Sequence, residues 1–128
     1  MADVFLSYAH GDAERAKALA RQIESEGFEV WWDDRLRTGR FSRQIESAIE
    51  KARCVVVLWS RYTEDSDWVS AEADRGRIAG KLVQVRLDGD CRIPMPFEWL
   101  QVLELSNWPL SDNLRQLEVV LEAVREPG

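Results

Sequence analysis

Histidine and cysteine are scarce in this 128-residue chain. His10 is the single histidine, and the two cysteines, Cys54 and Cys91, lie far apart. A structural zinc site takes several such ligands at close spacing, and a disulfide framework takes more cysteines, so we expect neither. Catalysis by a serine–histidine or cysteine–histidine pair is disfavoured for the same reason. The low cysteine content is typical of a protein in a reducing compartment.

Long apolar runs are also missing. No stretch of the sequence approaches the roughly 18 to 20 apolar residues that a membrane-spanning helix requires. The N-terminus lacks the basic and apolar regions of a signal peptide. The formal net charge of −6 at pH 7 argues against general binding to nucleic acid. We therefore expect a cytoplasmic protein that has neither a membrane nor a nucleic acid as its partner.

Strand-like and helix-like segments alternate along the chain. The apolar runs typical of strands cover residues 4–7, 28–32, 54–59, 82–87 and 102–105. Three further segments carry apolar residues at helical spacing, namely Ala16, Leu19, Ala20 and Ile23; Ile45, Ala48, Ile49 and Ala52; and Leu114, Leu117, Leu121 and Val124. Another helix is predicted to begin at Ser66 and Asp67, to be weakened by Gly76 and to end at Gly80.

This alternation predicts one α/β domain over residues 1–128, built on a parallel sheet of four to five strands with helices on both faces. Residues 54–59 are apolar on both faces, as in a central strand. Such sheets bind ligands outside the carboxyl ends of the strands, where the strand order reverses. The residues predicted to meet at that edge are Tyr8, Trp32, Asp33, Ser60, Trp68 and Glu72.

Trp68 and Glu72 lie four residues apart in the helix that follows the predicted central strand. This spacing places both side chains on one helical face, a stacking surface beside an anionic group. Two interpretations remain open from the pattern alone. The pair can form a binding site, or Trp68 can pack on the edge of the sheet while Glu72 is a solvated carboxylate, favoured by the helix dipole by about 0.3–1 kcal/mol.

A basic segment follows the second strand of this acidic chain. Arg35, Arg37, Gly39, Arg40 and Arg43 have the composition of an exposed loop. The arginine side chains suit either a phosphate clamp or an acidic partner, and an ordinary charged loop is the alternative.

Two known types of α/β site are disfavoured. Asp33 and Asp34 raise the possibility of a phosphoacceptor domain, but that architecture needs an aspartate after the third strand, where this chain has Ser60 and Arg61. The first strand is followed by residues 8–12, Tyr-Ala-His-Gly-Asp, which lack the G-x-G-x-x-G pattern of a dinucleotide-binding fold.

Five segments, residues 4–9, 27–33, 36–39, 55–60 and 67–72, resemble in order and spacing the successive boxes of a Toll/interleukin-1 receptor (TIR) domain of the bacterial type. The resemblance extends from Val4 to about Trp108. It implies a flavodoxin-like fold and one of two functions. Some members of this family cleave NAD+ between nicotinamide and ribose, and others are non-enzymatic modules that signal by assembly or interfere with host TIR signalling.

The resemblance also implies roles for individual residues. Glu72 matches the glutamate of the enzymatic members, Trp68 and Tyr8 would border the nucleotide pocket, and Arg35 matches a basic position in the following loop. We add Trp32 to the substrate-binding set from its position at a strand end. Ala9 departs from the basic residue that some animal enzymes carry there, so a phosphate contact at that position is lost.

An NAD-cleaving member would need no metal and no cofactor beyond NAD+ as its substrate. It would release ADP-ribose or a cyclic isomer, in bacterial immune signalling. The resemblance further implies homotypic assembly with other TIR domains, and we assign Arg37, Gly39 and Arg40 to this assembly. Because the chain ends just after its last predicted helix, we expect a sensor or oligomerising domain to follow in the natural protein.

Overall fold

The computed structural model describes residues 3–32, 42–109 and 114–126. The strands in these ranges are β1 (Val4–Ser7), β2 (Val30–Trp31), β3 (Cys54–Trp59), β4 (Leu82–Arg86) and β5 (Val102–Glu104). The α-helices are α1 (Ala13–Ser25), α2 (Ser42–Lys51), α3 (Asp67–Ile78) and α4 (Leu114–Arg125). Short 3-10 turns lie at His10–Asp12, Thr63–Asp65 and Phe97–Trp99.

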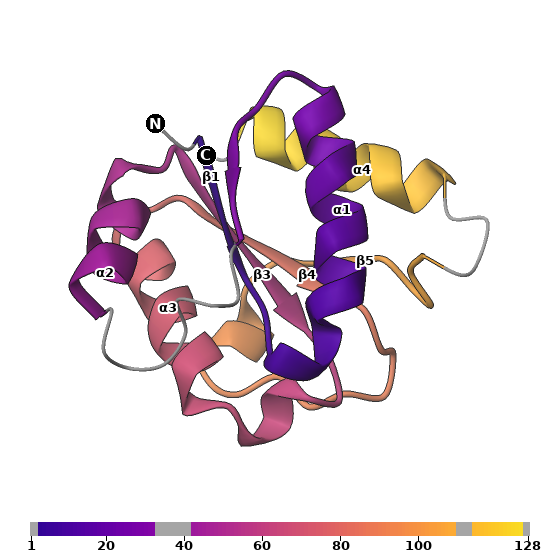
Figure 1. The fold of residues 1–128 in the computed structure, drawn as a ribbon. Coiled ribbons are helices and arrows are strands. Elements are labelled where there is room, and N and C mark those ends of the chain that lie inside the picture. Colours follow the sequence, from indigo (N-terminus) through magenta and orange to yellow (C-terminus); the bar gives the residue numbers. More distant parts are fainter. Residues whose placement is uncertain (1–2, 33–41, 110–113, 127–128) are drawn as a thin grey trace.

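All five strands form one parallel sheet in the order β2-β1-β3-β4-β5. This order is that of flavodoxin-like folds, and it reverses between β1 and β3. Helices α2 and α3 cover one face of the sheet, and α1 and α4 cover the other (Figure 1). The predicted α/β class, the two helical layers and the central position of β3 are therefore confirmed.

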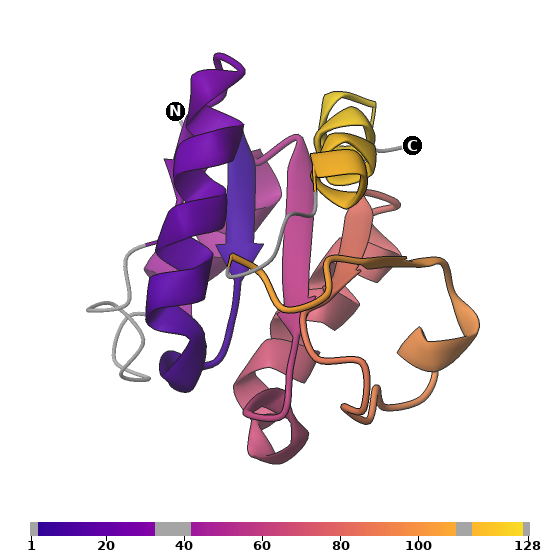
Figure 2. The same ribbon diagram turned by 90° about the vertical axis from the view of Figure 1, so that its right-hand side faces the viewer.

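The side chains of β3 explain why both faces are covered. Cys54, Val56 and Leu58 pack into the core beneath α1 and α4, whereas Val55, Val57 and Trp59 pack against the opposite layer, and all six are buried. A strand that is apolar on both faces is stable only between two layers. Figure 2, viewed from the α1 and α4 side, shows these two helices in front of the sheet.

The residues predicted to be buried in α1 are confirmed, and those predicted for α4 differ at one position. The buried residues of α1 are the predicted Ala16, Leu19, Ala20 and Ile23. In α4, Leu114 is 72% exposed and Val120 is buried in its place. Leu114 is the first residue of the helix, one turn before the buried set, which follows the regular i, i+3, i+4, i+7 spacing. The prediction for Leu114 was therefore wrong.

Helix α3 continues through Gly76 to Ile78, so the glycine does not end the helix, and its predicted weakening of the helix stays a prediction. A Cβ atom at this position would lie 2.9 Å from Val55 Cβ, so the glycine allows α3 to pack closely on β3. Gly80, with φ of +71°, follows the end of the helix as predicted.

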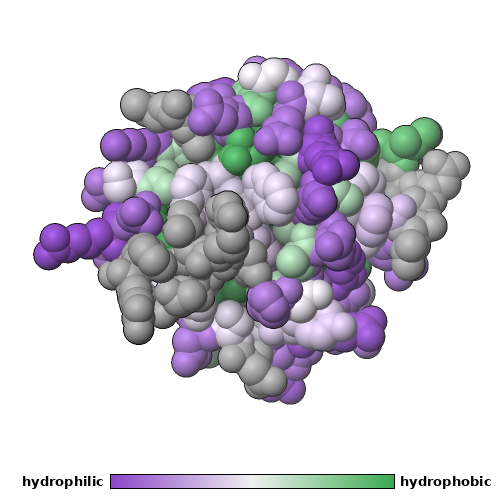
Figure 3. Space-filling model, in the orientation of Figure 1, coloured by the Kyte–Doolittle hydropathy of each residue, from purple (hydrophilic) through white to green (hydrophobic). Residues whose placement is uncertain are grey.

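The surface in the orientation of Figure 1 is mostly hydrophilic, with smaller apolar areas between the polar side chains (Figure 3). No helix within the described ranges is long and apolar enough to cross a membrane.

Candidate functional site

Glu72 is a buried carboxylate at the carboxyl end of β1. Ser66 caps α3, since its Oγ accepts a hydrogen bond from the Val69 N–H at 3.3 Å, and this sets the start of the helix. Glu72 then lies in the second turn, facing the sheet, and is only 4% exposed. The Ser7 hydroxyl donates a hydrogen bond to Glu72 Oε1 at 2.6 Å. The fold thus holds an acidic side chain where burial is costly without such a partner.

A small pocket between α2 and α3 is lined in part by Glu72, whose Oε2 atom is itself buried. Its volume is about 130 Å³, and it is lined by Ile45, Glu46, Ile49, Trp68, Ala71, Glu72 and Arg75. The indole Nε1 of Trp68 is buried and has no hydrogen-bond partner within the part of the chain that the structure describes. The pocket is therefore lined by an aromatic side chain and by the side chain of a buried carboxylate, residue types that orient a polar, planar ligand.

Tyr8 and Trp32 do not lie at this pocket. Tyr8 is 1% exposed and packs in the core beneath α1 and α4, where Trp32 also packs. The Tyr8 hydroxyl donates a hydrogen bond to the carbonyl oxygen of Trp32. Successive side chains of a strand point to opposite faces, so Ser7 faces α3 and Tyr8 faces away from it. Tyr8 and Trp32 thus follow β1 and β2 at the predicted edge of the sheet, but their side chains pack in the layer opposite α3. Their predicted substrate contacts stay predictions.

Ser60 also belongs to a different cluster. Its hydroxyl donates to the carboxylate of Asp12, which in turn accepts from Arg15 at 2.6 Å. Arg15 also donates to Asp88 at 3.0 Å, so four side chains link the ends of β1, β3 and β4. Asp12 directly precedes α1, but its side chain makes no capping hydrogen bond to that helix. This network closes the edge of the sheet beside the point where the strand order reverses.

The Arg15 pairing changes the titration of Asp88. The hydrogen bond from the Arg15 guanidinium lowers the pKa of Asp88 to about 2, and the hydrogen bond with Asp88 raises the pKa of Arg15. A wide hollow of about 880 Å³ lies beside these residues. Arg15 pairs with both carboxylates, and Arg61 Nε lies 3.5 Å from Asp88 Oδ2. These charges are therefore paired within the protein and hold the fold together. Sequence reasoning missed this network, although Asp12 and Arg15 have the i, i+3 spacing of an ion pair.

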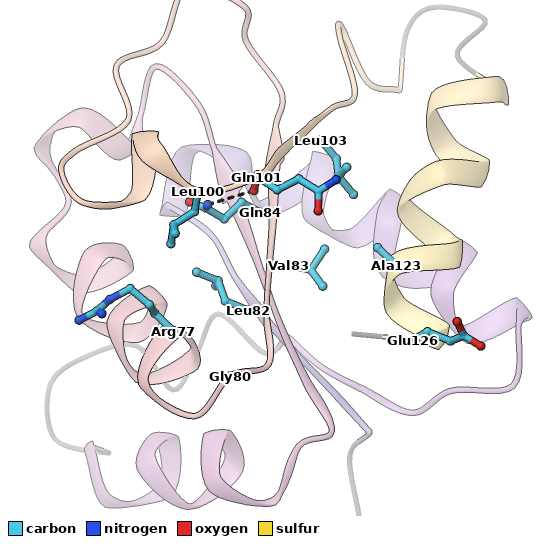
Figure 4. A pocket seen from close by; sticks show the side chains of 10 residues that line it. All are labelled: Arg77, Gly80, Leu82, Val83, Gln84, Leu100, Gln101, Leu103, Ala123 and Glu126. Carbon is cyan, nitrogen blue, oxygen red and sulfur yellow. Dashed lines mark hydrogen bonds between the residues drawn. The ribbon is translucent and has the colours of Figure 1, made fainter. Parts of the chain in front are cut away.

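A third hollow lies at the other edge of the sheet, between β4, β5 and the helices that flank them (Figure 4). It has a volume of about 370 Å³ and a largely aliphatic wall that includes Leu82, Val83 and Leu103. The amide of Gln84 is engaged, because its Nε2 donates to the carbonyl oxygen of Gln101 at 3.1 Å. This hollow therefore lacks a buried reactive group comparable to Glu72.

Neither cysteine offers a reactive thiolate. Burial raises the pKa of Cys54 to about 12 and that of Cys91 to about 11, so both thiols stay protonated at neutral pH. Among the described residues there is no cluster of three or more potential metal-binding side chains.

Several predicted site residues lie outside the described ranges. They are Asp33, Asp34, Arg35, Arg37, Gly39 and Arg40. The predicted substrate contact of Arg35 and the predicted assembly role of Arg37, Gly39 and Arg40 stay predictions.

Residues 4–118 match the family model described as the TIR domain. The chain belongs to the TIR domain family. The resemblance of the five sequence segments is thereby confirmed, and the order of the strands agrees with it.

This TIR domain is similar to the NAD(+) hydrolase PdTIR of Paracoccus denitrificans, with 35% identity over 75 residues. The match covers 56% of this chain and 25% of that protein, so the chain spans about a quarter of the length of the curated relative that it matches.

Two solved structures share the fold of this TIR domain. The TIR domain of the Toll-related receptor TRR-2 from Hydra magnipapillata is 20% identical, with a TM-score of 0.79 over 98% of this chain and 99% of that chain. A metazoan TIR-STING receptor from C. gigas in complex with 2',3'-cGAMP is 24% identical, with a TM-score of 0.76 over 99% of this chain and 40% of that one. At such identities the likeness concerns the fold alone.

Proposed function

We propose that this TIR domain cleaves NAD+ at the bond between nicotinamide and ribose, with Glu72 as the essential carboxylate. The observation that carries the proposal is the burial of Glu72 beside a pocket that Glu72 and Trp68 both line. The similarity to a bacterial NAD(+) hydrolase supports the same activity.

One carboxylate suffices for this reaction. Ordinary glycosidases use two, because the departing oxygen must be protonated by one while the other attacks or activates water. The nicotinamide of NAD+ is a cationic pyridinium and leaves as a neutral molecule, so no general acid is required. Glu72 then binds the ribose hydroxyls and stabilises the positive charge that develops on the sugar. Trp68 holds the nicotinamide ring by stacking.

The size of the pocket bears on how the enzyme works. A volume of about 130 Å³ is below the roughly 300–1,000 Å³ of sites that enclose a whole ligand. The pocket thus suits the reacting end of NAD+, and the remaining nucleotide extends beyond it. Homotypic assembly, in bacterial immune signalling, would enlarge the site with groups from a neighbouring domain. Attack by water gives ADP-ribose, and attack by another part of the same nucleotide gives a cyclic isomer.

Nicotinamide release tests the proposal. The purified chain at high concentration is incubated with NAD+ and compared with Glu72→Gln, which removes the negative charge and keeps the shape of the side chain. The control is Glu122→Gln, an exposed position on α4. We expect release from the unmodified chain and from the control, and a loss of at least a hundredfold in Glu72→Gln, because transition-state charge is no longer compensated. Equal release from all three proteins would contradict the role of Glu72.

A second function, as a non-enzymatic assembly module, is favoured by a different observation. Met95, Trp99 and Leu100 are exposed apolar side chains close together in the sequence, and Trp99 is 74% exposed. Apolar groups gathered on a surface are typical of protein–protein contacts. This function predicts self-association that is insensitive to Glu72→Gln and no loss of NAD+ in the assembled state.

A further inference from the structure

Arg75 lies three residues after Glu72 in α3 and lines the same pocket. We propose that Arg75 binds the diphosphate of the dinucleotide and that Glu46 competes with the diphosphate for the Arg75 guanidinium. This inference rests on the proposed cleavage of NAD+. Arg75 is the one basic side chain among the described residues that line the pocket. A dinucleotide whose nicotinamide end enters there brings two negative charges near this guanidinium.

The positions along α3 match the order of groups in the substrate. With a rise of about 1.5 Å per residue, Glu72 lies roughly 6 Å along the helix from Trp68, and Arg75 lies roughly 4.5 Å farther. Trp68, Glu72 and Arg75 also share one helical face, as residues at i, i+4 and i+7 do. The series of aromatic ring, carboxylate and guanidinium thus follows the series of nicotinamide, ribose and phosphate.

The pocket between α2 and α3 continues beyond Arg75 into an adjoining hollow, and the two together form a groove. The adjoining hollow has a volume of about 190 Å³ and is lined by Ile78, Ala79, Lys81 and Glu50, together with Glu46, Ile49 and Arg75, which it shares with the 130 Å³ pocket. Arg75 therefore lies where the two hollows meet. The diphosphate joins the two halves of the dinucleotide, so a guanidinium at this junction is placed to bind it while the adenosine half follows the groove.

The present partner of Arg75 is easily exchanged. Arg75 Nη2 lies 3.0 Å from Glu46 Oε1 across the groove, and the two side chains are 55% and 52% exposed. Exposed ion pairs of this kind contribute little to stability. A diphosphate offers the guanidinium a bidentate, doubly charged partner in place of one carboxylate.

The other basic side chain of the groove is engaged elsewhere. Lys81 Nζ donates hydrogen bonds to the carbonyl oxygens of Ile49 at 2.7 Å and Ala52 at 2.6 Å, at the end of α2. These bonds hold the α2 wall of the groove in place, because they occupy carbonyl groups that the last turn of a helix leaves without partners. Lys81 is thus a structural group, and Arg75 is the cation available to a ligand.

The test compares substrates with and without the diphosphate. Arg75→Gln is expected to raise the KM for NAD+ roughly tenfold, the effect of one lost charged hydrogen bond, with a smaller change in kcat. Cleavage of nicotinamide riboside, which has no phosphate, should be unaffected. Glu46→Gln should lower the KM for NAD+, because the competing carboxylate is gone. Arg77→Gln removes the same charge from α3 at a residue paired with Asp74 and is the control.

Several kinetic outcomes would overturn the inference and leave the cleavage of NAD+ intact. They are an unchanged KM for NAD+ in Arg75→Gln, an equal effect on nicotinamide riboside, or an equal effect of Arg77→Gln.

A binding measurement separates this inference from the proposed activity. Isothermal titration calorimetry with ADP-ribose, which contains the diphosphate and no nicotinamide, needs no turnover. Affinity that falls about tenfold in Arg75→Gln and not in Arg77→Gln supports the diphosphate site even where no NAD+ is cleaved. Equal affinity of the unmodified chain and Arg75→Gln, or no binding of ADP-ribose to either, would overturn the inference.

Discussion

Ser7 is the polar group that accompanies the proposed catalytic carboxylate in the core. It is the last residue of β1, and its Oγ lies 2.6 Å from Glu72 Oε1. A hydroxyl that donates to an ionised carboxylate compensates part of the cost of burying the charge and fixes the orientation of the group. Ser7 therefore acts through Glu72 as a positioning residue in the proposed reaction.

Ser7→Ala should lower the kcat of nicotinamide release roughly tenfold, because one hydrogen bond to a charged group is worth about 1.5 kcal/mol. Ser70→Ala, in α3 on a less buried position, is the matched control. Steady-state kinetics with NAD+ give kcat, and circular dichroism checks that both variants are folded. A folded Ser7→Ala protein with the kcat of the control would show that Glu72 is positioned without this hydroxyl.

Helix α3 is the element that carries the candidate site. Its cap at Ser66 sets where the turns begin, and Gly76 allows its later turns to lie close to β3. The same helix supplies Trp68, Glu72 and Arg75 to the groove. A change in how α3 packs on the sheet would therefore displace all three side chains together.

Gly76→Val is expected to lower the free energy of unfolding by about 3 kcal/mol, because a side chain is forced against Val55 in the central strand. Gly89→Val is the control, since a Cβ atom at Gly89 meets no heavy atom within 4 Å and its backbone is not left-handed. Urea unfolding gives both values, and the control should change by less than about 0.5 kcal/mol. Equal stability of the two variants would contradict the close packing of α3 on β3.

In the molecule as a whole, the network around Arg15 links the segments that follow β1, β3 and β4 at the carboxyl ends of these strands. This side chain connects Asp12, after β1, with Asp88, after β4, and Asp12 is bonded to Ser60, after β3. The segments come together only when the strands have assembled in their final order. Their charges therefore link global stability to pH.

Acid should weaken the fold through Asp88. Its pKa in the folded protein, about 2, is below the ordinary value of 3.8, so its contribution to stability is complete well above pH 4 and is lost as the pH falls towards 2. This contribution is about 1–2 kcal/mol. Asp88→Asn should reduce the slope of stability against pH between pH 4 and pH 2, whereas Asp90→Asn, at an exposed position, should keep it. Urea unfolding at several pH values measures the slope, and identical slopes in both variants would contradict this role.

Local patterns predicted a large part of this protein. The apolar spacing of Ala16, Leu19, Ala20 and Ile23 identified the buried face of α1, and the apolar run of β3 identified the central strand. These predictions succeed because helical and strand periodicities depend on neighbouring residues. They were less accurate at the ends of elements, as for β2, which covers Val30–Trp31 rather than residues 28–32.

The sequence by itself determined the α/β class, the two-sided sheet and the shared helical face of Trp68 and Glu72, because each follows from side-chain spacing along one segment. Only the tertiary structure decided that Ser7 joins Glu72 while Tyr8 points away into the opposite layer. It also decided that Glu46 and Arg75 face each other across the groove. The physical reason is that contacts between elements depend on strand order, strand register and helix packing, which no single segment encodes.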